Sequence, residues 1–250
     1  ICNMDPQQAA KKLIGWEKFP KKFQKQLDYD YSFSGLMLYL GLDDGIDLRD
    51  HGFGKFNIWH MEDWDMNEMW DKGAGLDFDK IWWFMSTPSL HSEDKTTTPA
   101  GGQILEIATF VSYDTFKKTQ DASYAEYMKM KLEMADLLLD KIEEKHIPNL
   151  RNHIKVKQIG SPTTNEDFVL APGGNAYGSA MTPKNLGLGR LKAWTPWDNF
   201  FWCNASSGFA GIAGTLHTGV QLYMDLTGDV FFTKDDLKTD EELIADLPKG

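Results

Sequence analysis

The segment Tyr31-Ser-Phe-Ser-Gly-Leu-Met-Leu-Tyr-Leu-Gly-Leu42 begins with alternating residue types and then becomes continuously apolar. This pattern predicts a central strand of a sheet, and Asp43-Asp-Gly45 is typical of the turn that follows a strand. Further strands are predicted at residues 53–61, 80–87, 103–111 and 152–159. Residues 31–159 therefore indicate an α+β layer, in which helices pack on an antiparallel sheet.

The clearest helix of the sequence starts after Ser123, which can act as its N-cap. Glu126 stands three residues later and completes a capping box, and His146-Ile-Pro148 ends the helix. Its apolar residues at four-three spacing predict the buried face: Met128, Leu132, Ala135, Leu139 and Ile142. Shorter helices are predicted at residues 7–14, 21–26 and 65–71.

The two ends of the chain differ from its middle. Residues 1–30 and 160–229 combine short strands, glycine turns and helices, like pieces of an α/β nucleotide-binding domain split by an inserted sheet. Within the second piece, the run from Phe200 to Cys203 predicts a buried strand, and Gly211 and Gly214 then open a helix. Such a turn can bring backbone N–H groups close to an anionic ligand, although the same pattern also fits a tight turn that binds nothing.

Residues 160–178 form a second glycine-rich segment. A Ser-Pro-x-Thr turn at Ser161 can start a short helix, and Gly173, Gly174 and Gly178 allow close approach of the backbone. Two glycine-rich elements in the same part of the chain favour a ligand-binding role over two coincidental turns.

Composition narrows the classes of function. The net charge of −11 argues against nucleic acid as a partner, because binding to phosphates needs a basic surface. Nine Trp, fifteen Phe, eight Tyr and eleven Met fit a large apolar cavity, a large interface or simply a rich core. The two cysteines give no disulfide framework. The sequence contains no apolar run of about 18 residues, so we predict no membrane-spanning helix. Peripheral membrane contact is left open.

Sequence motifs assign no catalytic residue. Neither a Gly-x-Ser-x-Gly elbow nor a G-x-G-x-x-G fingerprint after a strand occurs. The segment His60-Met-Glu-Asp63 contains three side chains that can ligate a metal, but the nearby acids have no matching histidine. We therefore predict no metal site.

The order of several motifs resembles a known family. The motifs are Ser161-Pro-x-Thr-Asn165, Ala171-Pro-x-Gly174, Ala176-Tyr-Gly178, the apolar strand after Asn199, and Gly211-x-x-Gly214. This order is similar to the C-terminal half of the flavin-dependent carotenoid and retinoid oxidoreductases, which include phytoene desaturases, carotenoid isomerases and retinol saturases. The opening Asn3-x-Asp-Pro6 and the strand Tyr39-Leu-Gly-Leu42 stand where that family would place them.

The resemblance implies a two-part flavoprotein. Residues 1–30 and 160–229 would be pieces of a Rossmann-like FAD domain, residues 31–159 an antiparallel substrate-binding domain, and residues 230–250 an acidic tail. The residues expected near FAD are Gly174, Tyr177, Gly178, Ser206, Gly211, Ile212 and Gly214. Those expected to line a tunnel for a lipid-soluble polyene are Phe33, Leu36, Leu38, Trp59, Trp82 and Phe84.

The implied reaction is hydride exchange or double-bond isomerisation of an apolar polyene at the flavin, in a plastid or endoplasmic-reticulum membrane setting. The N-terminal half of such a flavoprotein is absent, so we expect it to precede Ile1 or to come from another chain. Asn204 and Ser206 stand where the family usually has a glycine and an acidic residue. A catalytically degenerate structural or interaction subunit of a larger, membrane-associated assembly is therefore the alternative.

Overall fold

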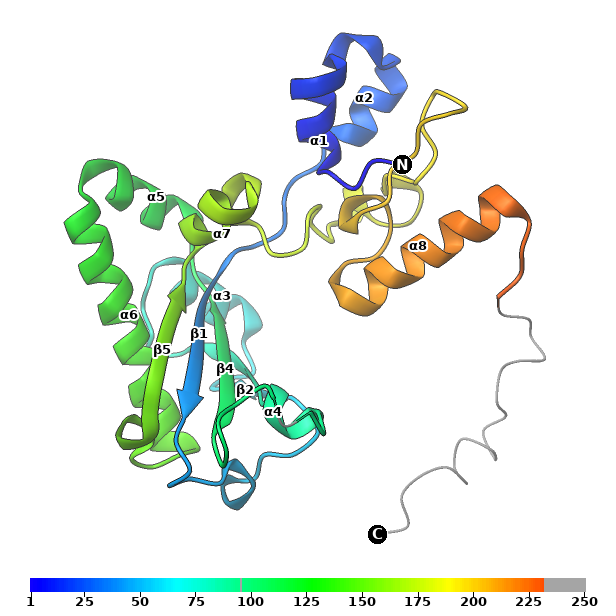
Figure 1. Cartoon of the computed structure of the whole chain (residues 1–250). Helices are drawn as coiled ribbons and strands as arrows, with labels where there is room; N and C mark the ends of the chain where they lie inside the picture. Colours follow the sequence, from blue (N-terminus) through cyan, green and yellow to red (C-terminus); the bar gives the residue numbers. More distant parts are fainter. Residues whose placement is uncertain (95, 232–250) are drawn as a thin grey trace. The chain divides into compact units, whose positions relative to one another are not determined.

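The computed structural model describes residues 1–94 and 96–231 (Figure 1). The chain divides into two compact units. We call Tyr31–Ala176 the sheet unit. We call Ile1–Asp30 together with the chain from Tyr177 onward the terminal unit. The predicted acidic tail, residues 230–250, lies almost entirely outside the described residues.

The sheet unit contains a five-stranded sheet in which every neighbouring pair is antiparallel. The strand order is β2-β3-β4-β1-β5, so β1 is flanked on both sides as its apolar sequence predicted. All five predicted strands are confirmed, as β1 Gly35–Leu42, β2 Ile58–Met61, β3 Trp82–Ser86, β4 Gln103–Phe110 and β5 Ile154–Gly160.

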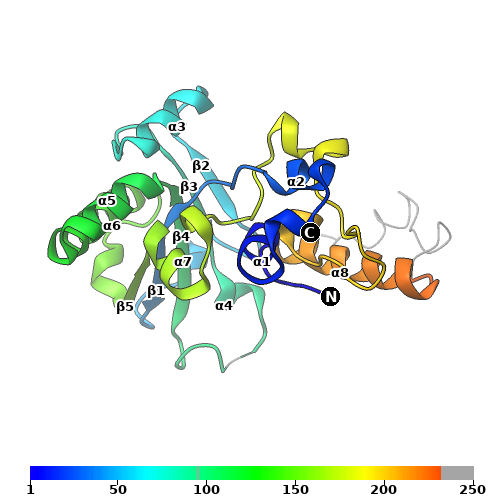
Figure 2. The ribbon, with the colours of Figure 1, turned by 90° about the horizontal axis from the view of Figure 1, so that it is seen from above.

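One face of this sheet is covered by the long helix α6, Tyr124–Lys145. Figures 1 and 2 show α6 and its neighbour α5 along the same side of the strands. The leucines at alternate positions of β1 are buried there, because side chains along a strand point alternately to its two faces. They share one core with the residues that α6 buries, which include Ala135, Leu138, Leu139 and Ile142.

Two details of the α6 prediction are wrong. Leu132 is 44% exposed, and Leu138 takes its place on the buried face. Only half of the predicted capping box is present, since the Ser123 hydroxyl accepts from the Glu126 amide at 3.3 Å while the Ser123 amide donates to Thr119 O. The reason is that α5 ends directly before Ser123 and supplies this acceptor.

The remaining helices of the sheet unit are short. Asp65 caps α3 through the amides of Asn67 and Glu68, and Ser161 caps α7 in a reciprocal box with Thr164. Their bounds are α3 Met66–Ala74, α4 Pro88–His91, α5 Tyr113–Ala122 and α7 Pro162–Val169. Three single turns of 3₁₀ helix complete the unit, at Leu48–His51, Leu150–His153 and Pro172–Gly174.

The terminal unit is helical. Its α-helices are α1 Pro6–Ala9, continued by a π-helical turn Ala10–Ile14, then α2 Lys21–Leu27 and α8 Gly211–Thr227. Its 3₁₀ turns are Trp16–Lys18, Pro183–Asn185, Gly187–Gly189 and Ala205–Ser207. Among residues 1–94 and 96–231, no helix has the length and hydrophobicity needed to cross a bilayer.

The predicted strand from Phe200 to Cys203 is wrong. This segment forms two isolated bridges instead, a parallel one between Cys2 and Trp202 and an antiparallel one between Trp194 and Phe201. A strand needs a neighbouring strand to satisfy its backbone groups, and here the segments at Cys2 and at Ala193–Trp194 supply only isolated hydrogen bonds. The segment is nevertheless buried as expected, with Trp202 fully covered.

Candidate functional site

We call the sheet surface on the side away from α6 the open face. It is formed by the side chains that alternate with the core residues, and the cross-strand register aligns them from strand to strand. Several of them are large, apolar and solvent-accessible, and Trp59 is 62% exposed. The large apolar residues of this face are Met37, Trp59, Met61, Trp82, Phe84, Ile104 and Val156.

Six aromatic rings meet at one end of the open face, and we call them the aromatic array. The Trp59 ring centroid lies 5.4 Å from that of Trp82 and 5.0 Å from that of Phe84. Phe33 makes edge contacts with Trp82 at 6.4 Å and Phe110 at 6.0 Å. The sixth ring, on α3, also makes an edge contact with Phe33. The array is Phe33, Trp59, Trp70, Trp82, Phe84 and Phe110.

Helix α3 brings the sixth ring into place. Trp70 stacks on Phe110 with ring centroids 3.7 Å apart. Such close packing requires a residue without a side chain at Gly73, where a Cβ would lie 2.9 Å from the Phe110 carbonyl oxygen. Sequence reasoning missed both Trp70 and Phe110, although the first stands in a predicted helix and the second in a predicted strand.

Four of the six residues predicted to line a tunnel belong to the aromatic array. Leu36 and Leu38 do not, because they point to the other face of β1, where both are fully buried in the core. The physical reason is the two-residue period of a strand, which separates these leucines from Met37 and Tyr39. That the array lines a substrate tunnel remains a prediction.

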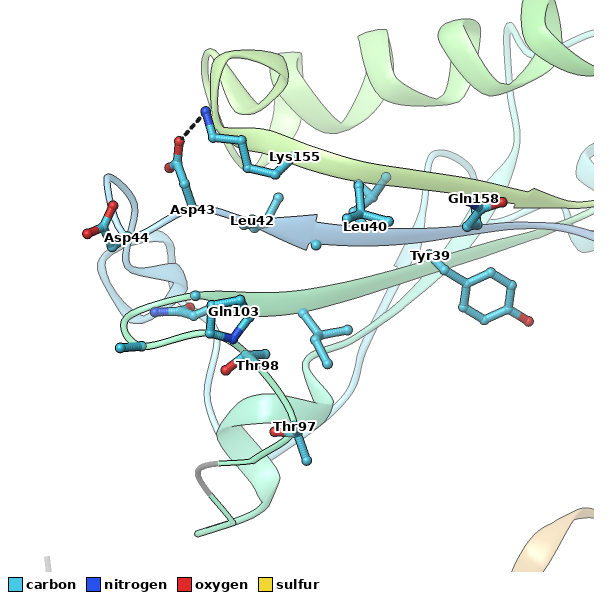
Figure 3. Close-up of a pocket in the computed structure, with 16 residues that line it drawn as sticks. Tyr39, Leu40, Leu42, Asp43, Asp44, Thr97, Thr98, Gln103, Lys155 and Gln158 are labelled. Carbon is cyan, nitrogen blue, oxygen red and sulfur yellow. Dashed lines mark ion pairs between the residues drawn. The ribbon is translucent and has the colours of Figure 1, made fainter.

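A pocket of about 510 Å³ lies at the other end of the open face. Its floor is apolar and comes from β1, β4 and β5 at Gly41, Ile104 and Val156, and the loop Thr97–Ala100 forms one wall. Figure 3 shows the ion pair between Lys155 Nζ and Asp43 Oδ2, 2.9 Å apart, at one end and Tyr39 at the other. The open face therefore joins an aromatic end to a pocketed end.

His60 and Glu62 are each engaged in structural contacts on or beside β2. The His60 ring stacks on Trp83 with centroids 4.1 Å apart. Glu62 pairs with Lys141 of α6 at 3.0 Å and accepts a hydrogen bond from the Ile81 amide. These contacts explain the motif His60–Asp63 as part of the packing between β2 and α6.

The residues predicted near FAD fall into different local settings. Gly174 belongs to the sheet unit and has a φ of +60°, and a Cβ there would lie 2.2 Å from Pro162 O. Its carbonyl accepts hydrogen bonds from Ser34 Oγ at 2.6 Å and Asn165 Nδ2 at 3.1 Å. This glycine is therefore required for packing against the start of α7.

Gly178 and Ser206 lie side by side in the terminal unit. A Cβ on Gly178, at φ +74°, would lie 2.4 Å from Ser206 Oγ. This hydroxyl accepts from the Ser179 amide at 3.0 Å and is hydrogen bonded to the Tyr29 side chain. Burial, followed by the charge of Asp5, raises the pKa of Tyr29, so its hydroxyl stays protonated and donates to Asp5.

The turn around Ser206 is held by two further side chains. Asn204 Oδ1 accepts from the amides of Ser206 at 3.0 Å and Ser207 at 3.1 Å, so it caps the turn. The buried Arg190 guanidinium donates to the carbonyl oxygens of Ala205 at 2.6 Å and Gly208. Burial lowers the pKa of Arg190. Sequence reasoning missed Arg190, which no motif marks.

The start of α8 is the open part of this segment. Gly211 has a φ of +79°, no atom lies within 4 Å of its missing Cβ, and no side chain caps the helix. Ile212 is 84% exposed, and Tyr177 is also exposed. Gly214 is closely packed, since a Cβ would lie 2.8 Å from Phe209 Cβ. Gly211 and Ile212 thus leave the helix N-terminus open to solvent, whereas Gly178, Ser206 and Gly214 shape the turn beside it.

Comparison with known proteins gives several relatives, while no family model matches the chain. The chain is 30% identical to a chloroplastic prolycopene isomerase of Daucus carota over 205 residues. The matched part is 80% of this chain and 30% of the relative. A chloroplastic prolycopene isomerase of Arabidopsis thaliana is 28% identical over 230 residues, 89% of this chain and 35% of the relative. An all-trans-retinol 13,14-reductase of Danio rerio is 23% identical over 140 residues, 53% of this chain and 23% of the relative.

The chain thus spans about a third or less of the length of the curated relatives that it matches. These relatives are enzymes of the kind that the motif order around Ser161, Gly178 and Gly211 resembles. The chain is homologous to the carotenoid and retinoid oxidoreductase family over most of its length.

Proposed function

We propose that this chain is part of an FAD-dependent oxidoreductase or isomerase that binds an apolar polyene on the open face of its sheet. The aromatic array carries this proposal, because it gathers six rings on the open face and leaves those of Trp59 and Trp70 exposed to solvent. Exposed apolar patches on a soluble unit usually mark a site for a ligand, partner or membrane. The names of the relatives, prolycopene isomerase and all-trans-retinol 13,14-reductase, supply the class of ligand.

The chemistry of such an enzyme comes from the flavin, which supplies hydride or electron transfer when it is bound. The part of this chain is then to bind the polyene, to orient it and to exclude water. Burial of apolar area contributes about 25 cal/mol per Å², so a polyene laid along several rings gains affinity without any hydrogen bond. This division of labour agrees with a sequence in which no nucleophile or acid–base pair stands out.

The start of α8 is where we place an anionic part of FAD. The first amides of this 17-residue helix carry no side-chain cap, and the helix dipole favours negative charge at this end. Gly211 leaves the approach open, and Ile212 lies beside it. Tyr177, Gly178, Ser206 and Gly214 belong to the same proposed cofactor region of the terminal unit, and Gly174 of the sheet unit is proposed separately as a cofactor contact. A plastid location is part of the proposal, supported by the plant relatives whose names say chloroplastic.

The absorption spectrum of the purified full-length protein tests flavin binding. We expect the visible bands of a bound flavin, weakened in Ile212→Glu and retained in Ile212→Gln. A carboxylate repels the anionic cofactor but is favourable for a helix N-terminus by about 0.3–1 kcal/mol, so unfolding would not explain the loss. A full-length protein that carries no flavin and takes up none when it is added would overturn the proposal.

Binding of a polyene tests the open face. Trp59→Ala removes the ring that joins Trp82 to Phe84, and we expect it to weaken retention of a polyene on gel filtration about tenfold, equivalent to 1.4 kcal/mol. Trp64→Ala is the matched control, because Trp64 is 92% exposed and stands outside the array. Equal retention by both variants would place the polyene elsewhere.

A non-catalytic subunit is the second candidate. The capping role of Asn204 favours it, since this side chain fills the position where the family's glycine would allow close backbone approach. A protein that has no flavin but forms a stable complex with other chains would support this candidate.

A further inference from the structure

A row of four polar side chains crosses the open face. Ser86 of β3 is paired with Glu106 of β4, Glu106 with Tyr39 of β1, and Tyr39 with Gln158 of β5. Residues directly opposite each other in neighbouring strands have Cβ atoms about 4.5–5.5 Å apart and point to the same face. The four side chains, which we call the polar row, therefore form one band across four strands.

The polar row separates two apolar regions of the open face. Two residues away along each strand, on the side of the aromatic array, the next row consists of Phe84, Ala108, Met37 and Gly160. On the opposite side are Ile104, Gly41 and Val156, which form the floor of the 510 Å³ pocket. Figure 3 shows Tyr39 and Gln158 at the end of this pocket away from the Asp43–Lys155 ion pair.

The polar row has unused hydrogen-bonding capacity. Within residues 1–94 and 96–231, no hydrogen bond or ion pair is formed by the side chains of Ser86, Glu106, Tyr39 or Gln158. Carboxylates elsewhere in the sheet unit, such as Asp43 and Glu62, do have lysine partners. Burial, then the nearby charge of Glu106, raises the pKa of Tyr39, which keeps its hydroxyl a donor.

A pure hydrocarbon lying across this band would be a poor ligand. It would strip water from the half-buried Glu106 carboxylate and the Tyr39 hydroxyl without replacing the lost hydrogen bonds. A buried polar group left without a partner is costly, and a charged one is more so. A ligand with an oxygen atom that lies over the polar row would avoid that penalty.

We propose that the polar row recognises a hydroxyl group on the ligand, so that the substrate class is a polyene alcohol and not a pure hydrocarbon. The ligand O–H donates to the Glu106 carboxylate, and its oxygen accepts from the Tyr39 hydroxyl. Ser86 and Gln158 extend the band to its two ends. This inference rests on the proposed function, since it assumes that a polyene lies on the open face.

Binding of two matched probes tests the inference. One is all-trans-retinol and the other is the hydrocarbon in which its hydroxyl is replaced by hydrogen, both titrated into the intact chain. We expect the wild type to bind the alcohol at least about tenfold more tightly, because a site built to hydrogen-bond a hydroxyl rejects the analogue that lacks it. In the double variant Glu106→Leu/Tyr39→Phe, the preference for the alcohol should fall to about threefold or less. The hydrocarbon should bind this variant more tightly than it binds the wild type, because no polar group loses its water.

Conservative variants and a control separate recognition from folding. Glu106→Gln keeps an acceptor and should retain part of the preference, whereas Glu106→Leu should abolish most of it. Glu133→Leu removes an exposed carboxylate on α6 and should leave the preference unchanged. Far-UV circular dichroism of every variant should match that of the wild type, because Tyr39→Phe is isosteric and Glu106 is only half-buried.

The outcomes distinguish the inference from the proposed function. If both probes bind the wild type equally and the row variants change nothing, the inference is overturned while a polyene site on the open face stands. If neither probe binds, both are overturned. A preference that persists in Glu106→Leu/Tyr39→Phe would place hydroxyl recognition outside the polar row and also contradict the inference.

Discussion

The two faces of the five-stranded sheet are both rich in apolar side chains, but their surroundings differ. On the α6 side, Leu36, Leu38, Leu40 and Leu42 are at most 4% exposed and share a core with Trp83 and Met85. On the open face, Tyr39, Trp59 and Met61 keep between 43% and 62% of their surface in solvent. Apolar composition thus does not decide burial, and the presence of a covering helix does.

The difference also separates stability from binding. Core residues stabilise the fold because their surface leaves water when the chain folds. The apolar side chains of the open face stay in contact with water after folding. A ligand that covers them can therefore still gain free energy by removing their surface from water. Mutations on the two faces should therefore affect different measurements, even when the altered residues are neighbours in sequence.

The largest expected effect comes from neighbours on β1. Leu38→Ala should lower the free energy of unfolding by about 2–5 kcal/mol, because it leaves a cavity in a fully packed core. Met37→Ala, one residue away on the open face, should cost about 1 kcal/mol or less. Urea unfolding of both variants measures the difference. Equal losses would show that the open face is as tightly packed as the core.

The continuous apolar run from Leu36 to Leu42 made β1 predictable, and alternation made β4 predictable. The same continuity hid which face each residue occupies, because Leu36, Met37 and Leu38 are all apolar and no polar residue marks the solvent side. The family resemblance places Leu36 and Leu38 with Phe33 in the expected tunnel, and the residue pattern gives no reason to separate them. Only the position of α6 shows that they belong to the core.

Other features depend on tertiary contacts that the sequence pattern does not contain. Helix α5 buries Phe116 alone, which is too little periodicity to predict it. The contact of Trp70 with Phe110 joins residues forty positions apart through a glycine in α3. For the cofactor region, glycine spacing located the turn and the start of α8, but it could not show that Gly174, Gly178 and Gly214 are required for packing.

An intermediate effect is expected where α3 covers the aromatic end of the open face. Alanine normally stabilises a helix interior relative to glycine by about 0.5–1 kcal/mol. At Gly73 the added Cβ would lie 2.9 Å from Phe110 O, so α3 must move and the rings of Trp70 and Phe110 must separate. We expect Gly73→Ala to destabilise the chain by about 1–3 kcal/mol.

Gly75→Ala is the control for this change. Its φ is −79°, and its nearest neighbours are carbonyl oxygens of its own helix at 3.4 and 3.5 Å, so the unfolding free energy should change by about 1 kcal/mol or less. Near-UV circular dichroism should report the lost ring stacking in Gly73→Ala alone. A stable Gly73→Ala with unchanged ring signals would mean that α3 is not held against the open face.

The smallest expected effect is a pH dependence of the unfolding free energy, which comes from His60 and His146 beside the buried Trp83. Burial, followed by the charge of His60, lowers the pKa of His146, and burial also lowers the pKa of His60, against the opposing charge of Glu62. His146 Nε2 accepts a hydrogen bond from Trp83 Nε1 at 3.3 Å, which requires an unprotonated nitrogen. Protonation of His146 Nε2 would leave the indole N–H of the fully buried Trp83 without its acceptor.

The sign follows from the direction of these shifts. An unfolded histidine has a pKa of about 6.5, so between that value and the lower native pKa the unfolded state binds more protons. The stability that neutral His146 and His60 provide is therefore complete above pH 6.5 and is lost as the pH falls below it. We expect the unfolding free energy, measured in urea from pH 7.5 to 5, to decrease more steeply in the wild type than in His146→Gln. His91→Gln, at an exposed position, should keep the wild-type slope, and an equally shallow slope in both variants would contradict a role for the buried pair.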